Sequence, residues 1–147
     1  DYGEGVAYRD YFSTDRLMFE VPRTDTRLKN KAEVLVLRSE TIGKNASPVA
    51  IAVERLQREP VFAFEAGGRN FVVITSKAGA NLLFERGAHT FVPRTQEGEL
   101  RDGSGKRWSV SAEGLVSETG ERLSRIPAHR AFWFGWVAQY PQTVLHK

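Results

Sequence analysis

The densest group of side chains that could do chemistry is the aromatic run at residues 129–136. Tryptophan offers a large flat ring and one N–H donor, and a neighbouring arginine can stack on a ring or bind an anion. The candidate ligand-binding residues, for a planar or acidic small ligand, are His129, Arg130, Trp133 and Trp136. Aromatic clusters of this kind are more often part of a hydrophobic core, so core packing is the favoured alternative.

Metal ligands are sparse and widely spaced. The three histidines, His89, His129 and His146, form no HxH or HxxxH pair, and the chain has no cysteine. A zinc or iron–sulfur site normally needs cysteine or closely spaced histidine ligands. The sequence therefore predicts no metal site and no cofactor.

One segment begins like a calcium-binding loop. It reads Asp102-Gly103-Ser104-Gly105, and Glu113 falls at the twelfth place, where a bidentate carboxylate would bind the ion. However, Lys106 and Arg107 occupy places that require an oxygen ligand and a glycine. A β-turn is the favoured interpretation of this segment.

Catalytic motifs are absent from the sequence. It contains no GxSxG, Walker, Rossmann or HExxH pattern. Two pairs of nearby carboxylates, Glu54 with Glu59 and Glu118 with Glu121, lie among arginines in segments that we expect to be exposed. Solvated surface charge is the favoured explanation for both pairs, so we predict no catalytic residues in this chain alone.

Composition describes an ordinary globular chain. Its 147 residues are 41% hydrophobic and 27% charged, which suits one domain over residues 1–147 with a single core. No stretch has the ~20 apolar residues of a membrane helix, so no membrane insertion is expected. The net charge is +3, but basic residues alternate with acidic ones along the chain, and we expect no nucleic-acid partner.

The chain up to residue 115 divides into a polar arm and a β-rich body. Residues 1–31 are polar with scattered aromatics, and we expect them to lie as an arm over the core. The body is expected over residues 33–115. It begins with β-branched runs at residues 33–38 and 49–53, and residues 54–59 are helix-forming.

Glycine-containing turns predict the hairpins of this body. The clearest joins residues 61–65 to 70–76 through Gly67 and Gly68, because paired glycines adopt positive φ angles easily. Two further pairs are expected: residues 80–85 with 88–93 around Gly87, and two strands within 99–115 around the turn at 102–105.

The last element is expected to be a helix over residues 128–140. Pro127 suits a first helical turn, Pro141 ends the run, and the segment is apolar nearly all round, as in a buried helix. The expected fold is mainly β, a β-rich α+β class. A small antiparallel sheet curls into a half-open barrel or roll, and the C-terminal aromatic helix closes it.

The C-terminal segment, extended through Tyr140-Pro141-Gln142-Thr143-Val144-Leu145, resembles the closing signature of domain-of-unknown-function family 3179. Short stretches elsewhere agree with it: Asp1-Tyr2-Gly3 through Tyr8 and Tyr11, Arg27-Leu28-Lys29-Asn30-Lys31 before Val34, the Gly67-Gly68 hairpin, and Asp102 to Trp108.

The resemblance implies a place in a longer protein. The family occurs mainly in bacterial and archaeal proteins that often carry export signals, which implies a periplasmic or other extracytoplasmic location. Its members have an upstream half with a cysteine-bearing stretch and a similar tryptophan-rich, Pro-x-Thr ending. This chain resembles the downstream half, and its Ser76-Lys77-Ala78-Gly79-Ala80 segment lacks the cysteine. The implied partner is the upstream half of the same protein or another copy.

Two functions remain open from the sequence. The favoured one is a non-catalytic extracytoplasmic domain that binds a ligand or partner. The alternative is half of an enzyme whose active site is completed by an upstream domain. The resemblance names no reaction, so it does not decide between them.

Overall fold

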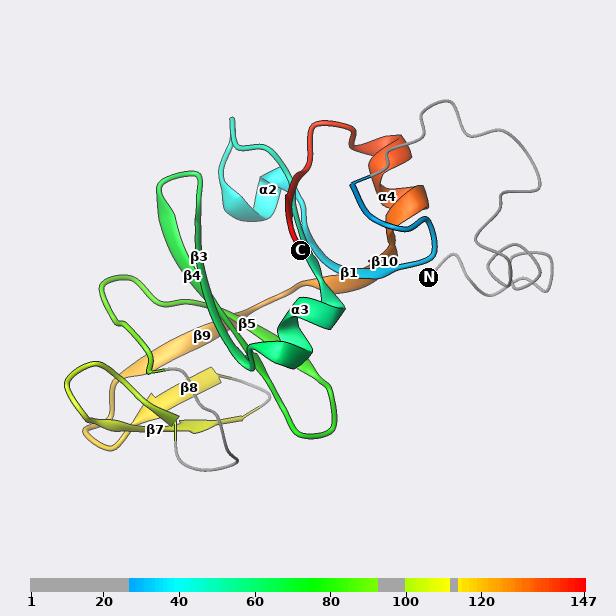
Figure 1. Ribbon diagram of the computed structural model, residues 1–147. Helices are drawn as coiled ribbons and strands as arrows, with labels where there is room; N and C mark the ends of the chain where they lie inside the picture. Colours follow the sequence, from blue (N-terminus) through cyan, green and yellow to red (C-terminus); the bar gives the residue numbers. More distant parts are fainter. Residues whose placement is uncertain (1–26, 93–99, 112–113) are drawn as a thin grey trace.

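The computed structural model describes residues 27–92, 100–111 and 114–147 of the chain. The helices of these residues are short: α2 (Ser39–Ile42), α3 (Val53–Arg58) and α4 (Trp133–Gln139). The strands (Figure 1) are β1 (Glu33–Leu37), β2 (Val49–Ala52), β3 (Val61–Ala66), β4 (Arg69–Thr75), β5 (Asn81–Glu85), β6 (Leu100–Arg101), β7 (Arg107–Val110), β8 (Gly114–Ser117), β9 (Arg122–Ile126), β10 (His129–Phe132) and β11 (Val144–His146).

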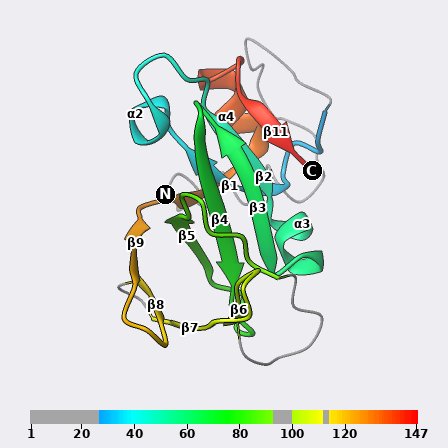
Figure 2. The ribbon, with the colours of Figure 1, turned by 90° about the vertical axis from the view of Figure 1, so that its left-hand side faces the viewer.

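The strands form two sheets. One has four strands in the order β10-β1-β2-β11, in which β11 runs parallel to β2. The other has seven antiparallel strands in the order β3-β4-β5-β9-β8-β7-β6 and curls into a half-barrel (Figure 2). Only Pro127 and Ala128 separate β9 from β10, so one continuous stretch of chain passes from one sheet to the other. This architecture confirms the expected mainly β class.

The four-stranded sheet is covered on both faces. In β1, Val34 and Val36 pack with the tryptophans of α4, whereas Leu35 and Leu37 pack with residues of β3 and β4. A strand buried on both sides needs apolar residues at every position instead of alternating polar ones. This explains the unbroken apolar segments 34–37 and 49–52.

The seven-stranded sheet is also apolar on both sides along its first three strands. Phe62 and Phe71 face the four-stranded sheet, whereas their neighbours Val61 and Val72 face the concave side of the half-barrel. Trp108 on β7 packs against that concave side. The core therefore has three apolar layers stacked across the two sheets.

The hairpin at Gly67 and Gly68 is confirmed. Both glycines have positive φ, 58° and 75°, as a two-residue turn of type I′ requires. A Cβ on Gly67 would lie 2.8 Å from Cγ2 of Ile42, so this turn also lacks room for a side chain. The short helix expected at residues 54–59 and the strands around the turn at 102–105 are present as α3, β6 and β7.

The expected pairing of residues 80–85 with 88–93 is wrong. Beyond Gly87 the chain leaves the sheet and makes one isolated bridge, between Phe91 and Asp102. The second neighbour of β5 is β9, about forty residues later in the chain. Arg86 helps to hold the turn, because its side chain donates to the carbonyl oxygens of Phe71 and His89.

The C-terminal helix is shorter than the expected 128–140 and begins at Trp133. Residues 129–132 instead form β10, which pairs with β1 from Val36↔His129 to Glu33↔Phe132. The backbone N–H and C=O groups on the edge of β1 need hydrogen-bond partners, and pairing with residues 129–132 supplies them. The β structure also continues past the expected limit of residue 115, through β9 to β11. Of the expected N-terminal arm, residues 1–26 lie outside the described residues.

Candidate functional site

The two predicted tryptophans lie in the core. Trp133 is fully buried and Trp136 is 4% exposed, and both pack against Val34, Val36 and Ala50 of the four-stranded sheet. The guanidinium of Arg27 lies over the ring of Trp133, 5.1 Å from its centroid. The structure therefore shows the core-packing alternative for these two rings.

The Pro-x-Thr segment after α4 holds the second of these rings in place. Trp136 Nε1 donates to Oγ1 of Thr143 (2.9 Å), and that hydroxyl donates to the backbone oxygen of Tyr140 (2.6 Å). The Tyr140 ring lies 4.3 Å from the ring of Trp136, and Thr143 is 2% exposed. The indole N–H that a ligand would use is thus already bonded within the chain.

The other two predicted residues lie exposed on β10. The rings of His129 and Trp136 lie in a T-shaped arrangement. The pKa of the His129 imidazole is lowered mainly by burial and to a lesser extent by the positive charge of Arg38. Arg130 donates to the backbone oxygen of Gly79 (2.5 Å) and to Oδ1 of Asn81 (3.1 Å). Ligand binding by the four residues stays a prediction, but two of them are core and a third is bonded to the β4–β5 turn.

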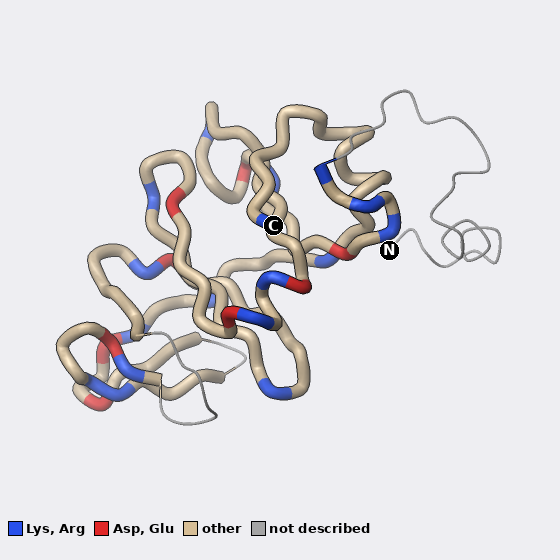
Figure 3. Tube along the Cα trace, viewed as in Figure 1, with Lys and Arg blue, Asp and Glu red and all other residues tan. Residues whose placement is uncertain are grey.

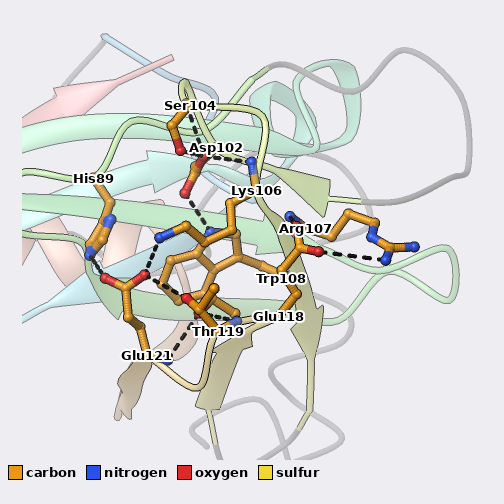
Figure 4. Close-up of polar contacts among 10 residues, drawn as sticks. His89, Asp102, Ser104, Lys106, Arg107, Trp108, Glu118, Thr119 and Glu121 are labelled. Carbon is orange, nitrogen blue, oxygen red and sulfur yellow. Dashed lines mark hydrogen bonds and ion pairs between the residues drawn. The ribbon is translucent and has the colours of Figure 1, made fainter.

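The segment that begins like a calcium loop is a β-turn, as expected. Its carboxylate, Asp102, is 5% exposed and accepts hydrogen bonds from Ser104 N, Ser104 Oγ, Lys106 N and Trp108 Nε1, at 2.6–3.0 Å (Figure 4). These donors, led by the Ser104 hydroxyl, hold the pKa of Asp102 far below its usual range. Its oxygens are occupied by protein donors, and Glu113 lies outside the described residues.

A second carboxylate, Glu121, joins the β8–β9 turn to two neighbouring segments (Figure 4). Lys106 Nζ lies 2.5 Å from Oε1 of Glu121, Thr119 Oγ1 donates to the same oxygen, and His89 Nε2 lies 3.5 Å from Oε2. The Lys106 hydrogen bond lowers the pKa of Glu121 and raises that of Lys106. The His89 ring meets the edge of the Trp108 ring at 5.1 Å.

This cluster contains the residue types of acid–base catalysis, but their arrangement differs from a nucleophile relay. His89 and Thr119 both contact the carboxylate of Glu121, whereas a relay needs the base to contact the nucleophile. The contacts of this cluster link the β8–β9 turn to Lys106 and His89. An active site completed by another domain stays a prediction.

Sequence reasoning missed a groove at one end of the four-stranded sheet. It has a volume of about 510 Å³ and lies where β2 passes into α3, beside the chain that leads into β1. Its apolar lining is Leu28, Ala32, Ala52, Val53 and Phe132. Its polar lining is Lys31, Glu33, Glu54, Arg55, Gln57, Arg58 and Lys147.

The groove was missed because its walls come from distant parts of the chain, at residues 28–33, 52–58, 132 and 147. Pairing of β1 with β10, and of β2 with β11, brings these segments to the same end of the sheet. The spacing of Arg55 and Arg58 on α3 is the one local signal, and it also fits an exposed helix face.

Two of the cations around the groove, Arg55 and Arg58, pair with glutamates of the same short helix. Arg55 pairs with Glu59 and donates to the backbone oxygen of Lys147 (2.8 Å). Arg58 and Glu54 are 3.5 Å apart with side chains 57% and 84% exposed, so their pairing contributes little to stability. Figure 3 shows Lys and Arg along α3 and in the segment before β1.

The net charge of the chain is +3 with histidine neutral, from 21 Lys and Arg residues and 18 Asp and Glu residues. Within the described lining of the groove, four cations stand against two carboxylates. The groove lining therefore has a local excess of positive charge.

Two searches of the described residues gave negative results. They contain no group of three His, Cys, Asp or Glu side chains placed to hold a metal ion. Within the same residues, every helix is too short or too polar to cross a bilayer.

Comparison with known proteins gave one match. The family model described as "Protein of unknown function (DUF3179)" matches residues 1–143, which is nearly the whole chain. No curated protein and no solved structure matched the chain.

Proposed function

Since the chain belongs to the DUF3179 family, whose description names no activity, we propose from its own surface that it is a non-catalytic binding domain with its site in the groove at β2 and α3. The observation that carries the proposal is the groove's composition, in which five apolar residues and four cations are among the described lining at the end of the four-stranded sheet. Ligand sites are typically concave, mostly apolar and ~300–1,000 Å³ in volume, with a few polar groups that orient the ligand.

The rim favours a ligand with a negative group. Four cations, Lys31, Arg55, Arg58 and Lys147, line the groove with two carboxylates, Glu33 and Glu54. One of these carboxylates already faces a cation outside the groove, since Glu33 Oε1 lies 3.8 Å from Arg130. The negative group of an anion with an apolar body would therefore contact the cations, and its body would contact the apolar lining.

The location and the macromolecular partner rest on the family resemblance alone. We place the domain outside the cytoplasm, as the family's export signals imply. The upstream half of the same protein, or another copy, is the partner that the resemblance implies. Both statements are proposals, and neither enters the argument for the groove.

A fluorescent anion with an apolar body tests the groove. The full chain is expected to bind 8-anilinonaphthalene-1-sulfonate at one site, and Lys31→Glu with Arg58→Glu is expected to weaken this binding by about tenfold. Both side chains are exposed, so the double variant should stay folded. Titration followed by dye fluorescence measures the change.

The matched control is Lys44→Glu with Lys77→Glu, which changes the total charge equally at two exposed turn residues outside the groove lining. The control is expected to bind the dye as the parent does. Equal loss of binding in both double variants would show that only net charge matters. Unchanged binding in the groove variant would remove the groove as the site.

A further inference from the structure

We infer that the occupant of the groove is an acidic polypeptide segment that also presents an apolar side chain. The inference rests on the proposed function, since it names the ligand of the same groove. It depends on how the cations are distributed around the groove, on the apolar part of its lining and on the positive net charge of the chain.

The cations are spread around the groove instead of converging on one point. Lys31 precedes β1, Arg55 and Arg58 lie on α3, and Lys147 follows β11. Three of them contact different acceptors: Arg55 pairs with Glu59, Arg58 pairs with Glu54, and Lys147 Nζ donates to the backbone oxygen of Arg27. A compact anion such as phosphate is held by donors that converge on it, whereas a peptide offers carboxylates at intervals along its length.

The exposed Arg58–Glu54 pair on α3 allows a ligand carboxylate to become the partner of Arg58. The Arg58–Glu54 contact is long and solvated, so a ligand carboxylate can replace Glu54 at small cost. The apolar part of the lining, which includes Val53 and Phe132, provides a place for one apolar side chain of the segment. Recognition of acidic motifs by clustered arginines is a recurring mode of peptide binding.

The same lining argues against a nucleic acid. Glu33 and Glu54 would lie close to a backbone that carries one phosphate per nucleotide, which is repulsive. Among the described residues of the lining, Phe132 is the single aromatic one, whereas single-stranded nucleic acids are usually held by bases stacked on several aromatic rings. Spaced carboxylates on a flexible peptide can avoid the two glutamates.

The net charge of the chain, +3, adds a long-range attraction for an acidic partner. Such attraction mainly raises the association rate and is screened by salt, because the Debye length shortens as ionic strength rises. Binding of the acidic segment is therefore expected to weaken strongly with salt.

Three synthetic heptapeptides test the inference with the full chain. Each has a central leucine, and the flanking residues are all glutamate, all glutamine or all lysine. The glutamate peptide is expected to displace 8-anilinonaphthalene-1-sulfonate and to bind at least about tenfold tighter than the glutamine peptide at low salt. The lysine peptide is expected not to displace the dye.

Substitutions in and outside the groove test whether the glutamate peptide binds there. Lys31→Glu with Arg58→Glu should abolish displacement by the glutamate peptide, whereas Lys44→Glu with Lys77→Glu should leave most of it. Glu54→Gln, which removes a rim carboxylate, should strengthen the binding. Isothermal calorimetry at two salt concentrations measures each affinity directly.

The outcomes separate this inference from the proposed function. If the dye binds in the groove but the glutamate peptide neither binds nor displaces it, the inference is overturned and the groove remains a ligand site. If an oligonucleotide or an anionic vesicle binds through Lys31 and Arg58 and the peptide does not, the inference is again overturned. If the dye does not bind in the groove, the proposed function fails with it.

Discussion

Replacing Trp136 with alanine is expected to lower the free energy of unfolding by about 3–5 kcal/mol, the usual cost of removing a buried aromatic ring. The ring is 4% exposed and packs between α4 and the four-stranded sheet. The substitution also removes the donor to Thr143 Oγ1 and the ring contact with Tyr140. The loss is expected near the top of that range, because packing and a buried hydrogen bond disappear together.

Equilibrium unfolding in urea, followed by circular dichroism, measures this effect. Trp136→Phe should cost less, because it keeps a ring but loses the hydrogen bond to Thr143. The control is Arg130→Ala, whose side chain is 39% exposed and which should cost less than about 1 kcal/mol. If Trp136→Ala were as stable as the parent, the assignment of this helix to the core would be wrong.

Replacing Asp102 with asparagine is expected to cost about 3 kcal/mol at neutral pH, because hydrogen bonds to a buried charged group are among the stronger ones. The carboxylate accepts bonds from two backbone amides, a hydroxyl and the Trp108 indole. An amide nitrogen in place of one oxygen would face donors instead of acceptors. The turn and the concave side of the half-barrel both depend on this residue.

The stabilisation contributed by Asp102 is expected to decrease as the pH falls. The pKa of Asp102 is lower in the folded chain than its ordinary value of about 3.9, so its stabilisation is present above that pH. It is lost as the pH falls below about 4 towards the folded pKa. The parent should therefore lose stability in acid more steeply than Asp102→Asn.

Urea unfolding at several pH values between neutral and strongly acidic measures this difference. Circular dichroism follows the unfolding, because tryptophan fluorescence would combine the signals of Trp108, Trp133 and Trp136. The control is Glu121→Gln, at a carboxylate that is 41% exposed, which should change the acid dependence much less. Parallel pH profiles for the parent and Asp102→Asn would contradict the account.

Local patterns in the sequence predicted the class of the fold and several of its parts. The paired glycines at 67 and 68 specify their hairpin, because positive φ at both positions leaves few alternatives. The turn at 102–105 was predictable for a similar reason, since an Asp at its start can bond to its own turn amides. In these places, the interactions that decide the structure lie within a few residues.

Errors arose where distant pairing decides the structure. Residues 129–132 look helical within an aromatic run, but the free edge of β1 draws them into a strand. The partner of β5 is β9 and not the next segment of the chain. The composition of a segment cannot show which edge lies beside it in the folded chain.

The candidate sites show the same difference between local patterns, which the sequence reveals, and distant contacts, which it does not. The aromatic run was recognisable, but its spacing alone could not separate core from pocket, and the tryptophans are buried. The groove combines residues from four separate segments, so no contiguous motif marks it.

The most direct test of the central claim is to map binding onto the surface by NMR. The labelled 147-residue chain would be titrated with 8-anilinonaphthalene-1-sulfonate, and backbone amide shifts would be followed for each residue. The account predicts the largest shifts at Ala32, in α3 from Val53 to Arg58, and at Phe132, which line the groove. The account would be contradicted by shifts that centre on His89 and Trp108, or by the absence of any saturable shift in the groove.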